Sequence, residues 1–515
     1  MRAVRYGFVI DQTKCIGCHA CTVACKEEHD VPLGVFRTWV KYVERGTFPD
    51  TRRFFSVLRC NHCDNAPCIT ICPTTALFRR DDGIVDFDRD RCIGCKSCMQ
   101  ACPYDALYID PQTHTAAKCN FCAHRVESGL EPACVIVCPE QAIIAGDLDN
   151  PASRIAGIVA TEQVQVRKAD QGTLPKLFYV GADAAALTPS LQESAEHLVW
   201  SERTTQDASL VRMLAANNGG AGAHGAGAAM SRPVYDVSHA AFPWGWKVSA
   251  YLWTKSVAAG ALLVAALGVL IGASVAGPVT SIAAPAVALV FLAATTALLV
   301  FDLKRPERFL FVITKPNFRS WLVLGAWILM AYGAVSTVWF VAGALGAHDW
   351  FRYLSPLVIL LAAGSAGYSA FLFGQAEGRD FWQSPMTLPH LLVAAVVAGA
   401  AALVILHALM GRPSARGGFF EGVFAIGLVL EGLVLAAEYL GSHSHTDASR
   451  AAHLVTRGPW RTQFWGGVVL AGIVAPLALV VAVPGAAPAA AVLALAGLWV
   501  YEHVWIRAGQ AVPLS

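Results

Sequence analysis

The sequence predicts two parts of different class: a small cysteine-rich α+β domain, followed by an all-α polytopic membrane domain of eight transmembrane helices. Two observations carry this prediction. All sixteen cysteines of the 515-residue chain lie before residue 140, and long apolar stretches dominate from about residue 251 onward. The chain is too long for one ordinary domain. Its net charge of +2, with no basic run, argues against a nucleic-acid partner.

The cysteines fall into four runs with short internal spacings. The first and third runs read C-x2-C-x2-C-x3-C, the second reads C-x2-C-x4-C-x3-C and the fourth reads C-x2-C-x11-C-x3-C. Run by run, the residues are Cys15, Cys18, Cys21, Cys25; Cys60, Cys63, Cys68, Cys72; Cys92, Cys95, Cys98, Cys102; and Cys119, Cys122, Cys134, Cys138. Three of the runs end in Cys-Pro. This pattern is typical of bacterial ferredoxin motifs that bind [4Fe–4S] clusters.

Zinc is the alternative occupant, because it also binds four thiolates. Zinc sites usually pair two C-x2-C halves across a longer gap, whereas each run here packs three or four thiolates into a short segment. We therefore predict an α+β ferredoxin-like four-cluster domain over residues 1–150. Its short strands are expected at 8–10, 84–87 and 107–109. Because these strands are few and short, they can bury only a small hydrophobic core. We therefore expect the bound clusters to stabilise the fold.

Three further segments follow the cluster domain. Residues 151–214 are predicted to form an extension that packs on the cluster domain or on a partner, with strands at 164–167 and 176–180. Residues 215–240 are Gly/Ala-rich at first and are predicted to form a linker. Residues 241–515 are predicted to form the membrane domain, because eight stretches are each long enough to cross a bilayer. The spans are expected near 251–272, 279–301, 320–342, 354–373, 388–410, 419–440, 464–483 and 487–505.

Eight spans place both ends of the membrane domain on the side of the cysteines. Twelve Lys and Arg residues flank the spans on that side, whereas the other side has Arg352, Arg412 and Arg416. The positive-inside rule therefore predicts a multi-pass protein of the inner (plasma) membrane with a cytoplasmic cluster domain. The first residues show no apolar signal core and no twin-arginine pair. The alternative is a periplasmic cluster domain, exported together with a partner that carries a signal.

Residues 1–200 resemble the four-cluster electron-transfer subunit of the molybdopterin oxidoreductases of the dimethyl-sulfoxide and polysulfide reductase type. All sixteen cysteines match that pattern. The resemblance implies four [4Fe–4S] clusters, with the first run paired to the fourth and the second to the third. The implied sets are Cys15, Cys18, Cys21, Cys138; Cys119, Cys122, Cys134, Cys25; Cys60, Cys63, Cys68, Cys102; and Cys92, Cys95, Cys98, Cys72. The first two would face a catalytic subunit and the other two the membrane.

The membrane half is similar to the polysulfide-reductase (NrfD-type) quinone-binding anchor. The similarity rests on the eight spans and on the segments KSVAAGALL (255–263), FDLKRPERF (301–309) and KPNFRSWLVLGAW (315–327). The two halves together imply an electron-transfer and anchor subunit of a quinone-linked oxidoreductase, using menaquinone or ubiquinone. No pterin or nucleotide motif is present in this sequence. The substrate site would therefore lie on a separate molybdenum or tungsten subunit.

Ionisable residues inside the spans are candidates for the quinone site. Glu431 and Glu438 lie seven residues apart, two turns along one face of the sixth span, and a carboxylate at that depth is a functional-site hypothesis by default. Further polar residues near the cluster-side ends of the spans could supply donors and a proton route: Lys255, Asp302, Arg305 and His390. The alternative for each is an interfacial charge or a polar group satisfied by a neighbouring helix.

Two further hypotheses concern the membrane half. His407 lies toward the far end of its span, and no facing histidine pair is evident, so we expect no haem. The His-rich segment 441–453 is expected to be a solvated loop. The alternative function is a redox-driven proton-translocating module, although His407 is the one evident relay in the far half. A third possibility is a structural anchor that binds no quinone.

Overall fold

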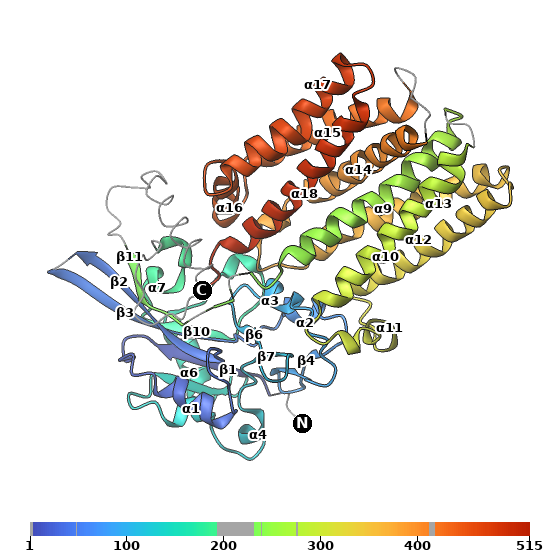
Figure 1. The fold of residues 1–515 in the computed structure, drawn as a ribbon. Helices are drawn as coiled ribbons and strands as arrows, with labels where there is room; N and C mark the ends of the chain where they lie inside the picture. Colours follow the sequence, from blue (N-terminus) through green and yellow to red (C-terminus); the bar gives the residue numbers. More distant parts are fainter. Residues whose placement is uncertain are drawn as a thin grey trace.

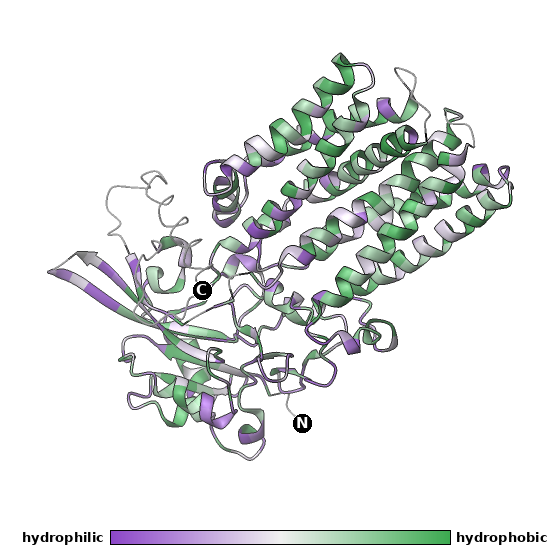
Figure 2. Ribbon diagram, in the orientation of Figure 1, coloured by the Kyte–Doolittle hydropathy of each residue, from purple (hydrophilic) through white to green (hydrophobic). Residues whose placement is uncertain are grey.

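The computed structural model describes residues 4–47, 49–192, 231–237, 239–240, 242–273, 277–410 and 418–515. A strand-containing domain with short helices lies against one end of a bundle of long helices (Figure 1). The bundle is mostly apolar along its length, whereas polar segments concentrate in the small domain and at the junction (Figure 2). Residues 215–230 of the predicted linker lie outside the described residues.

The central sheet of the small domain has four strands in the order β8-β1-β10-β9. Strand β1 (Tyr6–Asp11) pairs antiparallel with β8 (Ile143–Asp147) and parallel with β10 (Leu177–Val180), and β9 (Val164–Gln165) pairs with β10. The strands expected at 8–10, 164–167 and 176–180 are therefore present. Because β9 and β10 complete this sheet, the fold has no break at residue 150, and the segment after it packs within the cluster domain.

A second sheet, in the order β11-β2-β3, contains a long hairpin that the sequence analysis missed. Strands β2 (Thr38–Thr47) and β3 (Asp50–Arg59) pair along their whole length, and β11 (Ser231–Tyr235) adds to β2. In Figure 1 the hairpin extends away from the body of the domain. Strand β3 alternates poorly near its start, which hides the period of two that predicts a strand.

Two small hairpins flank the third run of cysteines. They pair β4 (Leu77–Arg79) with β5 (Val85–Phe87), and β6 (Leu107–Ile109) with β7 (Ala116–Lys118). The strands expected at 84–87 and 107–109 are thus confirmed. The helices of this domain are short: α1 (Ala20–Glu28), α2 (Pro67–Ile71), α3 (Ser97–Ala101), α4 (Ala123–Val126), α5 (Ala133–Ile136), α6 (Arg154–Thr161) and α7 (Ala184–Leu187).

Among the residues that the structure describes, eight helices are long and apolar enough to cross a membrane, as the sequence predicts. They are α9 (Trp246–Leu270), η3 with α10 (Val279–Asp302), α12 (Trp321–Ala344), α13 (Trp350–Gly374), α14 (Thr387–Leu409), α15 (Phe419–Leu440), η6 with α17 (Gln463–Ala482) and α18 (Ala487–Ala511). Helix α9 begins five residues before the expected start, and α18 ends six residues after the expected end. In the extra turn of α18, Gln510 accepts a hydrogen bond from Gln100 of the cluster domain, and Trp244, two residues before α9, donates one to the Cys95 carbonyl.

Helices α9 and α14 cross at two glycines. A Cβ atom at Gly260 would lie 1.7 Å from the carbonyl oxygen of Ala395, and one at Gly399 would lie 2.0 Å from the carbonyl carbon of Gly260. Helix α9 also packs against α10, α13 and α18. The crossing therefore brings two backbones into direct contact at the centre of the bundle.

The prediction of a solvated loop over the His-rich segment is wrong. Residues Thr446–Thr456 form helix α16, whose buried face includes Ala451, Leu454 and Val455. Apolar residues three and four apart make one side of this segment apolar, which favours an amphipathic helix. The histidines take little part in this apolar face, because His445 precedes the helix and His453 lies on its partly exposed side.

The segment that follows β11 is held to the cluster domain by ion pairs, of which Lys41–Asp236 is buried. Lys41 on β2 lies 3.3 Å from the Asp236 carboxylate. His239 lies 2.7 Å from Asp105 and 3.3 Å from Asp236. Burial alone lowers the pKa of His239, but the two carboxylates outweigh it and raise the pKa to about 10. Burial raises the pKa of Asp236, yet Lys41 and His239 lower it to about 2.

This cluster predicts a pH-dependent stability. Between pH ~6.5 and pH ~10 the folded protein keeps the His239 proton that the unfolded chain has lost. The stabilisation is therefore complete below pH ~6.5 and disappears as the pH rises through about 10. Detergent-solubilised wild type should melt at a higher temperature than His239→Gln at pH 6, and this difference should shrink toward zero at pH 10.5. A difference that stays constant over this range would contradict the assignment.

Candidate functional site

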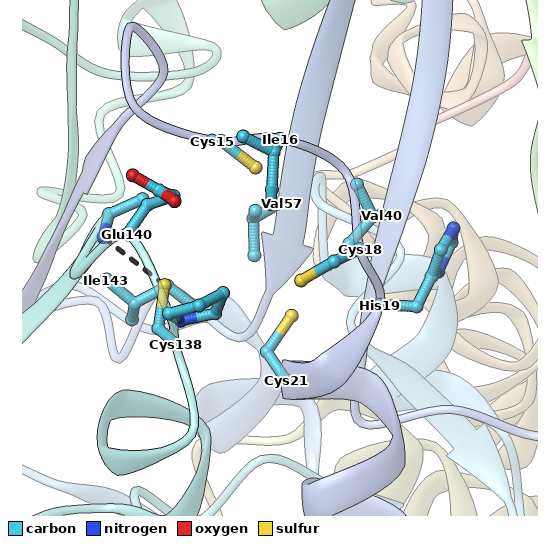
Figure 3. A pocket seen from close by; sticks show the side chains of 12 residues that line it. Cys15, Ile16, Cys18, His19, Cys21, Val40, Val57, Cys138, Glu140 and Ile143 are labelled. Atoms are coloured by element: carbon cyan, nitrogen blue, oxygen red, sulfur yellow. Dashed lines mark hydrogen bonds between the residues drawn. The ribbon is translucent and has the colours of Figure 1, made fainter.

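One cavity of the small domain is lined by cysteines from the first and fourth runs. Cys15, Cys18, Cys21 and Cys138 surround it, and their sulfur atoms face a common space (Figure 3). Cys18 is exposed and Cys21 is buried. The Ala142 N–H donates to the Cys138 Sγ at 3.2 Å. The folded chain thus brings together three cysteines of one run and the last cysteine of another.

A second cavity has the same composition at the other end of the domain. Cys92, Cys95 and Cys98 line it together with Cys72. This is the exchange of last cysteines that the resemblance implies for the second and third runs. The exchange follows from short helices: Cys98 lies on α3, and Cys102 immediately follows the end of that helix, so successive ligands of one run face different cavities.

The remaining eight cysteines lie close to one another in the implied sets. Burial raises the pKa of the Cys25 thiol, and Cys119 and Cys134 nearby raise it further. Burial likewise raises the pKa of the Cys63 thiol, as do Cys60 and Cys102. Such thiols would stay protonated on their own, because burial and neighbouring cysteines outweigh the nearby Arg59 and Arg37 cations that favour the Cys25 thiolate. Iron would favour the thiolate instead, since the thiolate is the form that binds metal.

Buried donors without protein partners test whether clusters fit these cavities. Among the described residues, buried side-chain atoms beside the cysteine runs lack a hydrogen-bond partner on Thr22, Arg59, Asn61, His62 and Ser97. A third nitrogen of Arg59, Nη1, donates to the Cys134 Sγ at 3.0 Å. Buried polar groups are normally paired, and the sulfides of a cluster accept hydrogen bonds. The donor set therefore fits [4Fe–4S] clusters.

The cavity of Cys72, Cys92, Cys95 and Cys98 is the one that lies against the membrane domain. Asn317 Nδ2 donates to the Cys72 carbonyl at 2.8 Å, and Trp244 Nε1 donates to the Cys95 carbonyl at 3.1 Å. Both donors belong to the membrane half, at the ends of α12 and α9. The membrane domain thus contacts the backbone of the cysteines directly.

Asp302 and Arg305, both candidates from the sequence, lie in this same junction. Asp302 ends α10 and lies 2.8 Å from the Lys96 Nζ. The Arg305 Nε donates to the Thr113 carbonyl at 2.8 Å. Both side chains are therefore engaged in docking the cluster domain, as the interfacial alternative anticipates.

A buried group of three ionisable residues lies deeper in the bundle. The His390 Nδ1 on α14 is 2.8 Å from the Glu431 Oε1 on α15, and the His390 Nε2 is 3.7 Å from the Glu502 Oε1 on α18. All three side chains are buried, and the Tyr501 ring lies 4.4 Å from the His390 ring. Glu431 Oε2 has no hydrogen-bond partner among the described residues. This His–Glu–Glu group is the most concentrated ionisable site within the described spans.

Glu502 was missed in the sequence analysis. It lies between Tyr501 and His503 near the cluster-side end of the last span, and it is fully buried. The usable signal was an acidic residue nine positions before the end of α18, and therefore about 14 Å from that end. An ionisable residue so far inside a span is a functional candidate.

Glu438 and Lys255 make their hydrogen bonds to residues outside the His–Glu–Glu group. Glu438 accepts a hydrogen bond from Ser384, and its Oε1 lacks a partner among the described residues. The Lys255 Nζ donates to the Ala366 carbonyl at 2.9 Å and to the Ser369 Oγ at 2.6 Å, and lies over the Tyr368 ring at 4.7 Å. The candidates from the sequence therefore have different partners: His390 pairs with Glu431, Glu438 with Ser384 and Lys255 with Ser369, while Asp302 and Arg305 contact the cluster domain.

Comparison with known proteins assigns both halves. A 4Fe-4S dicluster domain model matches residues 51–148, and a polysulphide reductase NrfD model matches residues 237–513, more than half of the chain. The N-terminal part is 46% identical to the tetrathionate reductase B subunit of Salmonella typhimurium over 202 residues, which cover 38% of this chain and 80% of that protein. It is 43% identical to the polysulfide reductase B polypeptide of Wolinella succinogenes over 183 residues, covering 35% and 95%.

A third relative is the arsenate respiratory reductase iron–sulfur subunit ArrB of Shewanella sp., 33% identical over 225 residues that cover 34% of this chain and 96% of that protein. With the eight spans, these matches show a multi-pass membrane protein with an iron–sulfur electron-transfer domain. The chain therefore belongs to the NrfD polysulphide reductase family, fused to an iron–sulfur subunit of the reductase type.

Proposed function

We propose that this chain passes electrons between a separate catalytic subunit and the membrane quinone pool through four [4Fe–4S] clusters. The main support for this proposal is the position of the two cysteine-lined cavities. One has an exposed cysteine, Cys18, at its rim, and the other lies against the ends of α9 and α12. When bound, the clusters supply one-electron carriers. The fold holds the first carrier at a surface and the last at the membrane domain.

A partner is supported by apolar residues exposed around the first cavity. Ile16 is 55% exposed, Val23 is 65% exposed and Ile136 is 55% exposed. Ile16 lines the cavity beside Cys15, Val23 lies between Cys21 and Cys25, and Ile136 lies two residues before Cys138. Exposed apolar residues grouped around a functional site are typical of a protein interface. We assign this face to a molybdopterin subunit with molybdenum or tungsten, consistent with the reductase names of the relatives.

The quinone site is placed at the cluster-side level of the bundle, near the His–Glu–Glu group. A quinone head group gains two protons when it is reduced, so its site needs a proton carrier. His390 lies between Glu431, at 2.8 Å, and Glu502, at 3.7 Å, so its ring can carry a proton between the two carboxylates. Glu438 with Ser384, and Lys255 with Ser369, lie on neighbouring helices and are the further candidates. Asp302 and Arg305 act instead by positioning the cluster domain against the bundle.

A His390→Gln variant tests this assignment. With its iron incorporated, the full chain in nanodiscs should be reduced by dithionite at the wild-type rate. The subsequent oxidation by added menaquinone or ubiquinone analogue should slow at least tenfold, because the proton carrier is lost. His407→Gln, at the far end of the same helix, is the matched control and should oxidise normally. Wild-type oxidation rates in His390→Gln would reject the site, and iron far below ~16 per chain would reject the four-cluster assignment.

Proton translocation is a second candidate function, favoured by buried hydroxyl groups beyond the His–Glu–Glu group. The Tyr332 hydroxyl donates to the Ala258 carbonyl at 2.6 Å, and Ser336 donates to the Tyr332 carbonyl at 2.7 Å. Trp339 donates to the Thr280 carbonyl at 3.1 Å, near the far end. The far half therefore offers more polar groups than His407. Proteoliposomes that show quinone-linked proton uptake beyond the scalar protons would support this candidate, and uptake equal to the scalar value would reject it.

A cytoplasmic cluster domain is the sidedness we propose, on the charge asymmetry of the loops. Protease protection of the β2–β3 hairpin in right-side-out vesicles would support it. Cleavage of the hairpin in intact vesicles would place the domain outside.

A further inference from the structure

A buried arginine of the membrane half lies at the junction and contacts the segment that links two cysteine sites. Arg379 lies between α13 and α14 and is 6% exposed. Its Nε donates to the Gln100 Oε1 at 2.9 Å. Gln100 lies on α3, between Cys98 and Cys102, which line different sites in the assignment above. Arg379 therefore contacts a short segment that joins two cluster sites, the one that contains Cys102 and the one that contains Cys98. These two are called the inner cluster sites.

The backbone beside Arg379 is in direct contact with one of these sites. A Cβ atom at Gly378 would lie 2.6 Å from the Cys102 carbonyl oxygen and 2.8 Å from the Gln100 carbonyl oxygen. No side chain larger than hydrogen fits between the two chain segments at this point. The glycine lets the loop of the membrane half approach Cys102, and it carries Arg379 with it.

The other partners of Arg379 are neutral. Its Nη1 lies 3.2 Å from the Gln510 carbonyl and 3.2 Å from the Val512 carbonyl. Within the described parts of the chain, no carboxylate lies within ion-pair distance of this guanidinium. An arginine guanidinium stays protonated in proteins. The side chain therefore keeps its charge at neutral pH.

Burying a cation that has no ion-pair partner costs free energy, so we expect a group of opposite charge near Arg379. The contrast with Lys96 is informative. Lys96 lines the neighbouring cavity, but Asp302 lies 2.8 Å from it and neutralises the pair. Near Arg379, the groups that can carry negative charge are Asp105, which is already paired with His239 at 2.7 Å, and the cysteine thiolates of the Cys102 site with the cluster they would hold. Net charge near a cluster is one of the factors that set its reduction potential.

We propose that Arg379 is a positioning residue that raises the reduction potential of the cluster held by Cys60, Cys63, Cys68 and Cys102. Reduction adds one electron and hence one negative charge to the cluster, and a fixed cation nearby stabilises the more negative state. The membrane half thereby sets the driving force of the step between the two inner clusters. This inference rests on the ligand sets of the proposed function.

Gln510 holds the cation in place without adding charge. The Gln100 Nε2 donates to the Gln510 Oε1 at 2.7 Å, and the Gln510 Nε2 donates to the Trp244 carbonyl at 2.9 Å. A merely structural role for Arg379 would be to complete this network. Removal of the network and removal of the charge can therefore be separated by mutation.

The test is a potentiometric titration of the full-length, iron-loaded chain, followed by electron paramagnetic resonance. In Arg379→Gln, the equilibrium constant for reduction of one inner cluster should fall at least tenfold, which is about 59 mV for one electron. The three other clusters should shift less than threefold. Arg379→Lys should keep most of the wild-type value, because it keeps the charge. Arg379→Met is the second neutral variant, since it fills similar space without burying an unpaired amide.

Two matched controls complete the design. Gln510→Met removes the network but no charge and should leave the potential within threefold of wild type. Arg167→Gln removes a buried cation from the same junction whose partners are the Leu187 and Leu514 carbonyls, and it should also leave the inner clusters unchanged. The inference is overturned if neutral variants titrate like wild type, or if Arg379→Lys or Gln510→Met shifts as far as Arg379→Gln. Fewer than four clusters in the wild type would instead reject the proposed function.

Discussion

A Cys72→Ala variant should lose the cluster site formed with Cys92, Cys95 and Cys98, and should keep the site formed by the other cysteines of its own run. The reason is geometric, since Cys72 lines the cavity of the third run. A missing thiolate removes between one and all four irons of a cubane, so iron should fall from ~16 to between ~12 and ~15 per chain. Because this cavity lies against the membrane domain, electron transfer to quinone should fall at least ~1000-fold, while reduction of the other clusters by dithionite continues.

Cys102→Ala is the reciprocal control. It should disturb the site of Cys60, Cys63 and Cys68 and leave the Cys92 site intact. Paramagnetic resonance spectra of the two variants should therefore lack different signals. If each run instead supplied all four ligands of its own cluster, Cys72→Ala would lose the signal of the Cys60 site and Cys102→Ala that of the Cys92 site. That exchanged result would overturn the assigned pairing.

A Gly260→Ala variant should show a severe loss of stability in the membrane half. The new Cβ atom would lie 1.7 Å from the Ala395 carbonyl oxygen, and the obstacle is backbone, which cannot turn aside as a side chain can. Helices α9 and α14 must therefore separate. Overpacking of this kind costs about 3 kcal/mol, and the central place of α9 should carry the separation to its other neighbours. Thermal unfolding in detergent should show a markedly lower midpoint and less purified protein.

Gly422→Ala on α15 is the matched control. Nothing lies within 4 Å of a Cβ at this position, so the substitution removes a helical glycine without a clash. It should leave the unfolding midpoint unchanged or raise it slightly, since Ala favours a helix over Gly by about 1 kcal/mol. Equal midpoints for Gly260→Ala and wild type would show that α9 and α14 are not held at this distance.

Helices and strands could be predicted from the sequence wherever a short residue pattern determines the secondary structure. The eight spans are predictable because the cost of burying polar backbone in lipid forces long apolar helices. The β2–β3 hairpin was missed because polar residues of β3 interrupt the alternation near its exposed start. Helix α16 was missed because its pattern is amphipathic only when Ala448, Ala451, Leu454 and Val455 are read at helical spacing.

For the candidate site, single residues could be predicted from the sequence, but their contacts could not. Glu431 and His390 could be singled out one at a time, because a single ionisable residue in an apolar span is conspicuous. That they meet, with Glu502 as the third member, depends on how α14, α15 and α18 pack. Asp302 looked equivalent to them in sequence, yet it is engaged by Lys96 at the junction. Partners from distant segments leave no local signal.

The sequence by itself determined the chemistry of this protein: sixteen thiolates at cluster spacing and eight apolar spans, both of which are short-range patterns. Only the tertiary structure decided which cysteines share a cavity, which cavity lies against the membrane domain, and that Arg379 reaches Gln100 across 279 positions of sequence. The physical reason is that residue spacing sets what a short segment can bind. Distances between segments are set by packing, as at Gly260 and Gly378, where only the absence of a side chain allows two segments to meet.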